Sequence, residues 1–316
     1  MKKYRIAIDV GGTKFLYGLF DQENHILGRK KTKTPQGITN EDMSRKFYEE
    51  ITAFVKEYQI TMEEIQGIGV GLPGYVDYAG TLISGGSLEN VKCYPAGEEL
   101  KKLFPGLKIV VDNDTNLAAL AEQRYGAGKG CRNLCYTALS TGIGSGFIIN
   151  NELFRGDYGG AGESGHMLVT PGQGELCGCE NRGCIMSYAS GIMIANHIRT
   201  AIRKGRQTVM THMVKDMADI SAVQLHQAYL IGDPLAVEMY QQMIHYIGIY
   251  IYNIFTSFNF STFVCGGGLT AMGEDFLKDI SREANQYNHH KNQKMDIRYA
   301  ELGSDMGIIG AAIVLE

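Results

Sequence analysis

The chain has 316 residues, with 40 glycines, only 6 prolines and a hydrophobic fraction of 44%, which excludes a disordered chain and a collagen-like repeat. Its 30 basic and 34 acidic residues give a net charge of −4, and no basic tail is present, which argues against nucleic acid as the main partner. The length suggests roughly two domains, and the glycine share of about 13%, against a usual 7% or so, has to be explained.

The N-terminal third is predicted to alternate strands with helices. Asp9 interrupts the first apolar run and no small-residue cleavage site follows it, so the start does not resemble a signal peptide. Strands are expected at Tyr4–Val10, Phe15–Phe20, His25 to about Lys33, Ile65–Leu72 and Lys108–Val111, and helices from an Asn40 N-cap to about Tyr58 and from about Asp114 to a stop at Gly126.

The first strand leads into the turn Asp9-Val10-Gly11-Gly12-Thr13-Lys14. Two glycines after a strand let backbone N–H groups approach an anion closely, and Thr13 and Lys14 add a hydroxyl donor and a cation. Asp9 could hold magnesium through water, because magnesium keeps much of its hydration. For this motif alone, an ordinary hairpin turn is the alternative.

Acidic and amide side chains crowd the start of the second helix, in Asp112-Asn113-Asp114-Thr115-Asn116. One of them is expected to cap the helix. Since four such side chains exceed what capping needs, a carboxylate here is also a candidate to accept the proton of a hydroxyl that attacks phosphate.

The plan of strand, glycine turn, strands and helix then repeats, which predicts two similar α/β halves with a cleft between them. Met243–Phe260 is the longest apolar-leaning segment, and its His245, Asn253 and tyrosines favour a buried helix over a membrane span. Strands are expected at Asn133–Leu139, Phe147–Asn150, Thr262–Cys265 and Ile297–Leu302, and helices near Ser187–Lys204, Ser221–Leu230, Pro234–Phe258 and from about Ser304.

Two more glycine turns follow strands in this second half. Glycines alternate in Thr141-Gly142-Ile143-Gly144-Ser145-Gly146, and Cys265-Gly266-Gly267-Gly268 closes a later strand. Each could be a tight turn. Three glycine turns at strand ends in a repeated plan favour a site for the phosphates and adenosine of a nucleotide.

Three of the seven cysteines lie close together at Cys177, Cys179 and Cys184. With His166 they form a Cys₃His set that is typical of structural zinc, and three free buried thiols are the alternative. An odd number of cysteines in a chain without an export signal predicts the reducing cytoplasm.

Together these motifs resemble the ROK family (repressors, open reading frames and sugar kinases) of the actin-like ATPase superfamily. The resemblance spans essentially the whole chain, through DVGGTK, NDTN, the signature from Leu139 to His166, the cysteine cluster, CGGG and the closing segment Gly303–Ala312. It implies an α/β fold of two actin-like (ribonuclease H-like) domains with a cleft between them and a small zinc-binding loop at residues 166–184. We expect a smaller domain of residues 1–112, completed by helix 304–316, and a larger domain of residues 113–303.

The family implies ATP-dependent phosphorylation of a hexose or hexose derivative, usually at the 6-hydroxyl. By matching positions, Asp114 would be the general base, and Asn113, Glu163 and His166 would contact the sugar. The resemblance also implies a small sugar and ATP as ligands and a homodimer, and from the charge and apolar patterns above no nucleic acid or membrane is expected as a partner. ATP and Mg²⁺ are expected at Asp9, Gly11, Gly12, Thr13, Lys14, Thr141, Gly142, Gly144, Gly267 and Gly268, and a structural Zn²⁺ at His166, Cys177, Cys179 and Cys184.

Two departures from the family pattern concern the sugar. Met186 stands where the cysteine motif usually ends in Glu, and a thioether is a weak acceptor. Glu180 stands where the family has Gly. The substrate loop Ser87–Val91, whose Asn90 is a further expected sugar contact, also fits the glucose-kinase pattern poorly. We therefore expect a modified or different hexose, or a substituted glycoside, in place of plain glucose.

Other functions within the family give different expectations. A sugar-sensing repressor would carry a DNA-binding helix-turn-helix before the first glycine motif, and the eight residues before Asp9 leave no room for one. A catalytically weak or inactive sugar-binding or regulatory ROK protein remains the alternative to a kinase.

Overall fold

The computed structural model describes residues 2–290 and 292–316. The chain divides into two compact units. Unit 1 comprises the residues up to Gly130 with Gly146–Gly162 and Glu301–Glu316, and unit 2 comprises Cys131–Ser145 and Glu163–Ala300. The expected boundary between residues 112 and 113 stays a prediction beside this division.

Unit 1 is built on a five-stranded sheet of order β3-β2-β1-β4-β8, in which β1 pairs antiparallel with β2 and parallel with β4. β1 and β4 have the predicted bounds, because both are largely apolar segments that the sheet buries. The strands are β1 (Tyr4–Val10), β2 (Lys14–Phe20), β3 (Ile26–Lys33), β4 (Ile65–Leu72) and β8 (Lys108–Asn113).

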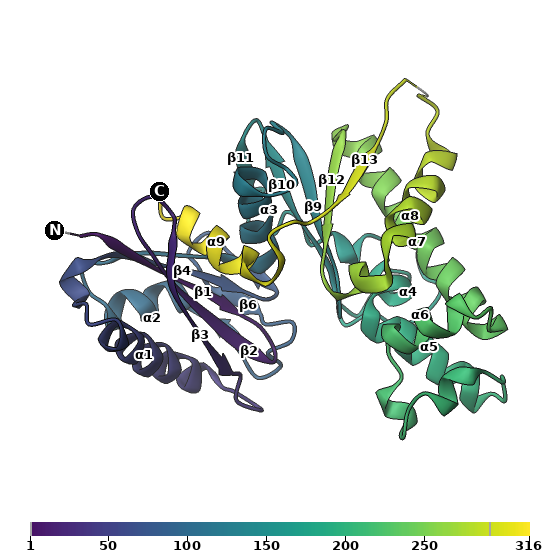
Figure 1. Cartoon of the computed structure of the whole chain (residues 1–316), viewed down its shortest axis with the longest axis horizontal. Coiled ribbons are helices and arrows are strands. Elements are labelled where there is room, and N and C mark those ends of the chain that lie inside the picture. Colours follow the sequence, from purple (N-terminus) through teal and green to yellow (C-terminus); the bar gives the residue numbers. More distant parts are fainter. Residues whose placement is uncertain (1, 291) are drawn as a thin grey trace. The chain divides into compact units, whose positions relative to one another are not determined.

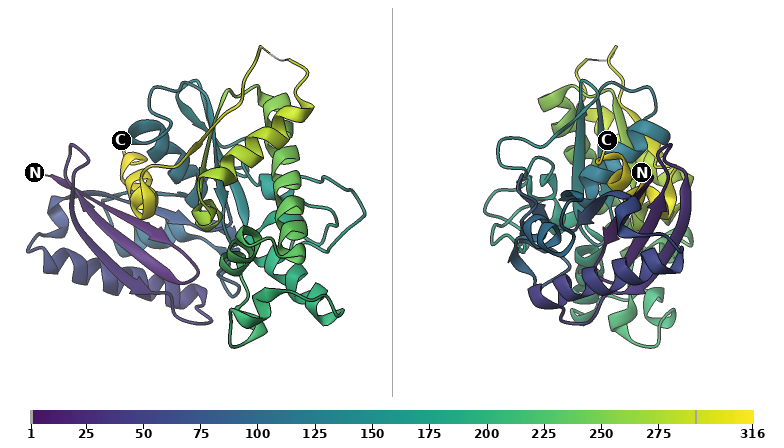
Figure 2. Two further views of the ribbon diagram at one scale, coloured as in Figure 1. Left: turned by 45° about the vertical axis from the view of Figure 1, so that its right-hand side comes forward. Right: turned by 90° about the vertical axis from the view of Figure 1, so that its left-hand side faces the viewer.

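Helices cover both faces of this sheet. α1 (Asn40–Glu57) and α2 (Ala96–Leu103) lie on one face and α9 (Met306–Ile313) lies on the other (Figures 1 and 2). Alternation along β1 supplies both cores, since Ile6 and Ile8 pack on the α1 side and Ala7 packs with α9. The remaining helices of unit 1 are α3 (Asp114–Tyr125), η1 (Met62–Glu64) and η6 (Gly303–Asp305).

Capping residues set where the helices of unit 1 begin. The expected N-cap Asn40 is wrong, because Thr39 caps α1 through a capping box in which its side chain and that of Asp42 exchange backbone hydrogen bonds. α3 starts after its cap Asn113 and ends at Gly126, as predicted.

The segment from residue 73 to residue 107 had no predicted element and carries a small antiparallel sheet of order β5-β6-β7, followed by α2. Its strands are too short for a hydrophobic period to be visible in the sequence. They are β5 (Tyr75–Val76), β6 (Leu82–Ser84) and β7 (Lys92–Tyr94).

The second sheet has the order β11-β10-β9-β12-β13, and β12 pairs parallel with both β9 and β13. The predicted turn Thr141–Gly146 is shorter than expected, because Ile143 already begins β10 and places Gly144 and Gly146 in that strand. The strands are β9 (Leu134–Leu139), β10 (Ile143–Ile149), β11 (Glu152–Phe154), β12 (Thr262–Gly266) and β13 (Asp296–Tyr299).

The long helix α7 (Pro234–Phe258) has its predicted bounds, with Asp233 as N-cap, and it packs beside α8 (Glu274–Tyr287) in unit 2 (Figures 1 and 2). The helix predicted near Ser187–Lys204 is two helices, because Ser190 has extended backbone and caps the second. The other helices of unit 2 are α4 (Met186–Ala189), α5 (Gly191–Arg203), α6 (Ala222–Leu230), η2 (Ser164–His166), η3 (Val209–His212), η4 (Met217–Asp219) and η5 (Gly268–Met272).

None of the helices formed by the described residues is both long enough and apolar enough to span a membrane. The segment Met243–Phe260 belongs largely to α7, whose Ile247, Ile251 and Phe255 are buried, in agreement with the predicted core helix.

Candidate active site

The first predicted phosphate turn joins β1 to β2 in unit 1. Gly11 N donates to Lys14 O at 2.8 Å, and Thr34 Oγ1 donates to Gly11 O at 2.6 Å, so the turn is fixed from two sides. A β-carbon added to Gly12 would lie 2.7 Å from Ser87 Cβ. The predicted substrate loop Ser87–Val91 therefore lies against this turn, with room for a glycine only.

Asp9 stands at the end of β1, directly before the turn. Burial raises the pKa of its carboxyl, and the nearby Lys14 ammonium lowers it. The start of α9 comes close, since a β-carbon on Gly307 would lie 2.5 Å from Asp9 Cγ. Asp9 is thus a shielded carboxyl between the first turn and the start of α9, which is chemistry suited to a hydrated magnesium ion.

Asp114 is the first residue of α3, and the cap Asn113 fixes its backbone. Asn113 Oδ1 accepts from Thr115 N at 2.8 Å and Asn116 N at 3.1 Å, while Asn113 Nδ2 donates to Gly74 O at 2.7 Å. The Asn113 side chain therefore makes its hydrogen bonds within unit 1. These bonds fix the first turn of α3, from which the half-buried Asp114 side chain projects.

An ion pair between Asp112 and Arg155, which the sequence did not predict, adjoins the start of α3. Asp112 is only 5% exposed, and its Oδ2 accepts from Arg155 Nε at 2.7 Å. Its Oδ1 accepts from Asn113 N at 2.7 Å and from Asn116 Nδ2 at 2.8 Å. Asp112 therefore holds the end of β8 and the first turn of α3 together. The sequence singled out Asp112, as part of the polar run Asp112–Asn116, but no sequence pattern indicated that Arg155 is its ion-pair partner.

Asn90, a further expected sugar contact, is exposed in the loop Ser87–Val91. Its Nδ2 donates to Gly37 O at 3.2 Å, where Gly37 has a left-handed φ of 68°. In this structure Asn90 ties its loop to the turn that precedes α1.

The two predicted phosphate turns of unit 2 adjoin each other. Gly267 has φ 95°, and a β-carbon there would lie 2.5 Å from Leu139 O at the end of β9. A β-carbon on Gly268 would lie 3.8 Å from Ser140 Oγ, and Ser140 N donates to Gly142 O at 2.9 Å to close the other turn. Only glycine at position 267 lets these two backbone segments approach each other so closely.

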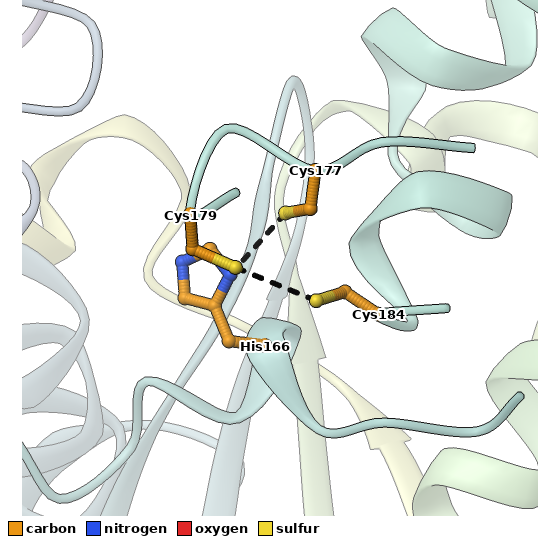
Figure 3. A group of neighbouring side chains, drawn as sticks. All are labelled: His166, Cys177, Cys179 and Cys184. Atoms are coloured by element: carbon orange, nitrogen blue, oxygen red, sulfur yellow. Dashed lines mark hydrogen bonds between the residues drawn. The ribbon is translucent and has the colours of Figure 1, made fainter. Parts of the chain in front are cut away.

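The predicted zinc ligands converge in unit 2. Figure 3 shows the His166 ring, from η2, pointing at the sulfurs of Cys177, Cys179 and Cys184, and the four ligand atoms all lie within 4.8 Å of one another. His166 Nδ1 is 3.4 Å from Cys177 Sγ, and Cys179 Sγ is 3.5 Å from Cys184 Sγ. Tetrahedral zinc with bonds of about 2.0–2.3 Å requires ligand atoms about 3.5–3.8 Å apart, so the donor set fits zinc in kind, and these two distances are close to that spacing.

One departure from the family pattern, Glu180 in place of glycine, lies at the tip of this cysteine loop. Glu180 is exposed and has φ 68°, a left-handed conformation that favours glycine. Glycine at this position would relieve the backbone, and Glu180 points its charge into solvent at the tip.

Glu163 and His166 face each other beside the cysteines. Glu163 Oε2 lies 3.9 Å from His166 Nε2, and both side chains are about one-third exposed, at 40% and 34%. Burial raises the pKa of the Glu163 carboxyl and lowers the pKa of the His166 imidazole. Because Nδ1 faces the cysteines, Nε2 is the nitrogen left to meet Glu163 or a ligand hydroxyl.

Met186 is the first residue of α4 and lies close to both the turn at Gly142 and the segment at Gly165. Its Cε would be 3.8 Å from a β-carbon on Gly142 and 2.7 Å from one on Gly165. The Met186 methyl group therefore packs between the phosphate turn and the Glu163–His166 segment, and it brings an apolar surface beside the expected sugar contacts.

Comparison with known proteins places these motifs in a family. The model of the ROK family matches residues 5–316. The chain belongs to the ROK family. A glucokinase of Streptomyces coelicolor is 33% identical over 312 residues, which cover 97% of this chain and 96% of the relative. An N-acetylmannosamine kinase of Vibrio vulnificus is 30% identical over 266 residues, which cover 84% and 82% of the two chains.

A solved structure agrees with this assignment. The ROK family glucokinase of Streptomyces griseus, crystallised with glucose and AMPPNP, is 30% identical and superposes with a TM-score of 0.81 over 98% of each chain. This match confirms the predicted α/β, actin-like fold class for the ROK chain.

Proposed function

We propose that this ROK chain is an ATP-dependent kinase that phosphorylates a hexose or hexose derivative at the 6-hydroxyl, with Asp114 as general base. The observation that carries the proposal is the placement of Asp114 at a helix start that Asn113 and Asp112 hold in position. The family match and the likeness to sugar kinases support the same activity.

In this mechanism the Asp114 carboxylate accepts the proton of the sugar hydroxyl. The hydroxyl oxygen forms a bond to the γ-phosphorus of ATP, and the bond from that phosphorus to the β-γ bridging oxygen breaks to release ADP. Backbone N–H groups at Gly12 and Gly142, with the Lys14 ammonium, offset phosphate charge, while the Gly11 N–H shapes the turn by donating to Lys14 O. Magnesium would be held through Asp9 and would neutralise charge on the transferred group.

Sugar hydroxyls are bound by Glu163 and by His166 Nε2, which lie on the same segment. The amide nitrogen of Asn113 carries a second hydrogen beside the one given to Gly74, and a sugar oxygen accepts it. His166 and the three cysteines would hold zinc, which would have a structural role by fixing the ring that presents Nε2.

Met186 decides which sugar is preferred. Loss of the carboxylate that glucose kinases of the family carry here removes a charge-assisted hydrogen bond, which typically contributes about 1.5–3 kcal/mol, or roughly 10- to 150-fold in affinity. We therefore propose a modified or different hexose, or a substituted glycoside, as the substrate. The likeness to an N-acetylmannosamine kinase is consistent with a substituted sugar.

A sugar panel tests the proposal. Hexoses, amino sugars, N-acetylated sugars and glycosides are incubated with MgATP, ADP release is followed, and phosphorus NMR locates the new ester. We expect turnover with a substrate other than plain glucose and an ester at the 6-position. Glucose as the clearly best substrate would overturn the specificity, and an unchanged kcat/KM for glucose in Met186→Glu would show that Met186 does not face the sugar.

The loss of the usual Glu at Met186 also favours a second candidate, a sugar-binding or regulatory ROK protein with weak or no catalysis. Calorimetric binding of a sugar without turnover of any sugar in the panel would establish it. We further expect a homodimer that does not bind nucleic acid, which light scattering and a DNA-binding assay would check.

A further inference from the structure

A cluster of buried hydroxyl groups lies within unit 2, and no role was predicted above for any of its members. Tyr250, on α7, is fully buried. Its hydroxyl group lies 2.9 Å from Ser164 Oγ and 3.4 Å from Thr137 Oγ1, and it forms a short hydrogen bond with Ser145 Oγ. A buried hydroxyl is costly unless it is hydrogen-bonded, and here the groups satisfy one another.

The two serines belong to different parts of the candidate active site. Ser145 lies in β10, directly after Gly144 of the glycine-rich phosphate segment. Ser164 begins η2, next to Glu163 and two residues before His166. One phenol therefore joins the strand that carries the phosphate turn to the segment that carries the sugar and zinc residues.

Backbone hydrogen bonds link Ser164 to its neighbours in the Glu163–Met167 segment. His166 N donates to Glu163 O at 3.1 Å, and Met167 N donates to Ser164 O at 3.0 Å. One turn further along α7, Asn253 Nδ2 contacts Met167 Sδ at 3.5 Å. The segment thus rests on α7 at two points, and Tyr250 supplies the point nearest to Glu163.

We propose that Tyr250 is a positioning residue, whose hydroxyl sets the phosphate turn and the Glu163–His166 segment relative to each other through Ser145 and Ser164. This inference rests on the proposed function for its kinetic consequences. Tyr250 is fully buried and acts on the site only through the two serines.

Three variants separate the two arms of the cluster. Ser164→Ala removes the arm to the sugar segment, Ser145→Ala removes the arm to the phosphate turn, and Tyr250→Phe removes both while keeping the ring. Tyr240→Phe is the matched control, because Tyr240 is a buried tyrosine of the same helix whose hydroxyl donates to Asp279 Oδ2 at 3.0 Å, outside the cluster.

Loss of one neutral hydrogen bond corresponds to about a 2- to 12-fold effect. We expect Ser164→Ala to raise the KM for the sugar by this factor and Ser145→Ala to raise the KM for MgATP. Tyr250→Phe should raise both, and Tyr240→Phe should change neither, although it lowers the melting temperature. Equal kinetic constants in Tyr250→Phe and Tyr240→Phe would overturn the proposal.

A second measurement does not depend on catalysis. Zinc affinity is measured by competition with a chromophoric chelator, and Tyr250→Phe and Ser164→Ala should bind zinc about 2- to 12-fold more weakly than Ser145→Ala and Tyr240→Phe. If the wild-type chain turns over no sugar, the proposed function fails, and this comparison alone decides the positioning role. Equal zinc affinity in all four variants would then refute it.

Discussion

The ion pair behind the proposed catalytic base allows a prediction from geometry. Arg155→Met removes the guanidinium 2.7 Å from Asp112 Oδ2 and keeps a side chain of similar length. The Asp112 side chain, which is 6% exposed, then keeps its charge without the guanidinium that pairs with it. The expected result is a loss of stability that is larger than for a surface pair.

The magnitude follows from burial. Removing one partner of a fully buried ion pair costs about 3–5 kcal/mol. Here Arg155 is 28% exposed, and Asp112 keeps its bonds from Asn113 N and Asn116 Nδ2, so we expect about 2 kcal/mol after this discount. The control is Arg206→Met, whose pair with Glu238 is about half exposed on both sides, at 48% and 52%, and should contribute no more than about 1 kcal/mol.

Urea unfolding of both variants and of a double-mutant cycle with Asp112→Asn measures these costs. In the Asp112→Asn background no charge is left unpaired, so adding Arg155→Met should cost little. The reasoning is refuted if Arg155→Met destabilises the chain no more than Arg206→Met, or if the Arg155 and Asp112 substitutions are additive.

Three further predictions concern the metal, the pH dependence and a buried carboxylate. Elemental analysis should find one zinc per chain, and its removal by a chelator should lower the melting temperature and raise the KM for the sugar; a metal-free chain with both values unchanged would contradict the structural zinc. Lys14 lowers the pKa of the Asp9 carboxyl, so Lys14→Met should raise that pKa and move the acid limb of kcat/KM for MgATP to higher pH, and an unmoved limb would exclude Asp9 as the magnesium-holding carboxylate. Glu122 is fully buried and accepts from the backbone N–H groups of Ala127, Glu301 and Leu302, so Glu122→Gln should destabilise the chain by about 1.5–3 kcal/mol in urea unfolding, whereas exposed Glu49→Gln should be silent.

Much of the fold could be predicted because its main elements carry strong local patterns. β4 and α7 have their predicted bounds, since one is a buried apolar run and the other has Asp233 and Pro234 as start signals. The segment from residue 73 to residue 107 could not be predicted, because its strands of two or three residues show no period.

The candidate site also contains residues that could be predicted from the sequence and residues that could not. The convergence of Cys177, Cys179 and Cys184 could be predicted because they lie close in the sequence, and the structure brings them together with His166, while zinc itself stays a prediction. Partners that meet only in the fold could not be predicted. Arg155 lies 43 residues from Asp112, and Tyr250 lies 86 residues from Ser164.

The central claim is that Asp114 accepts the proton of the attacking sugar hydroxyl. Single-turnover phosphorylation of the best sugar of the panel by Asp114→Ala, with calorimetric titration of the same sugar, tests it most directly. We predict a rate about 10²–10⁴-fold below wild type with sugar affinity retained, since general-base catalysis contributes about that factor. A rate close to wild type in a variant that binds the sugar normally would contradict the account.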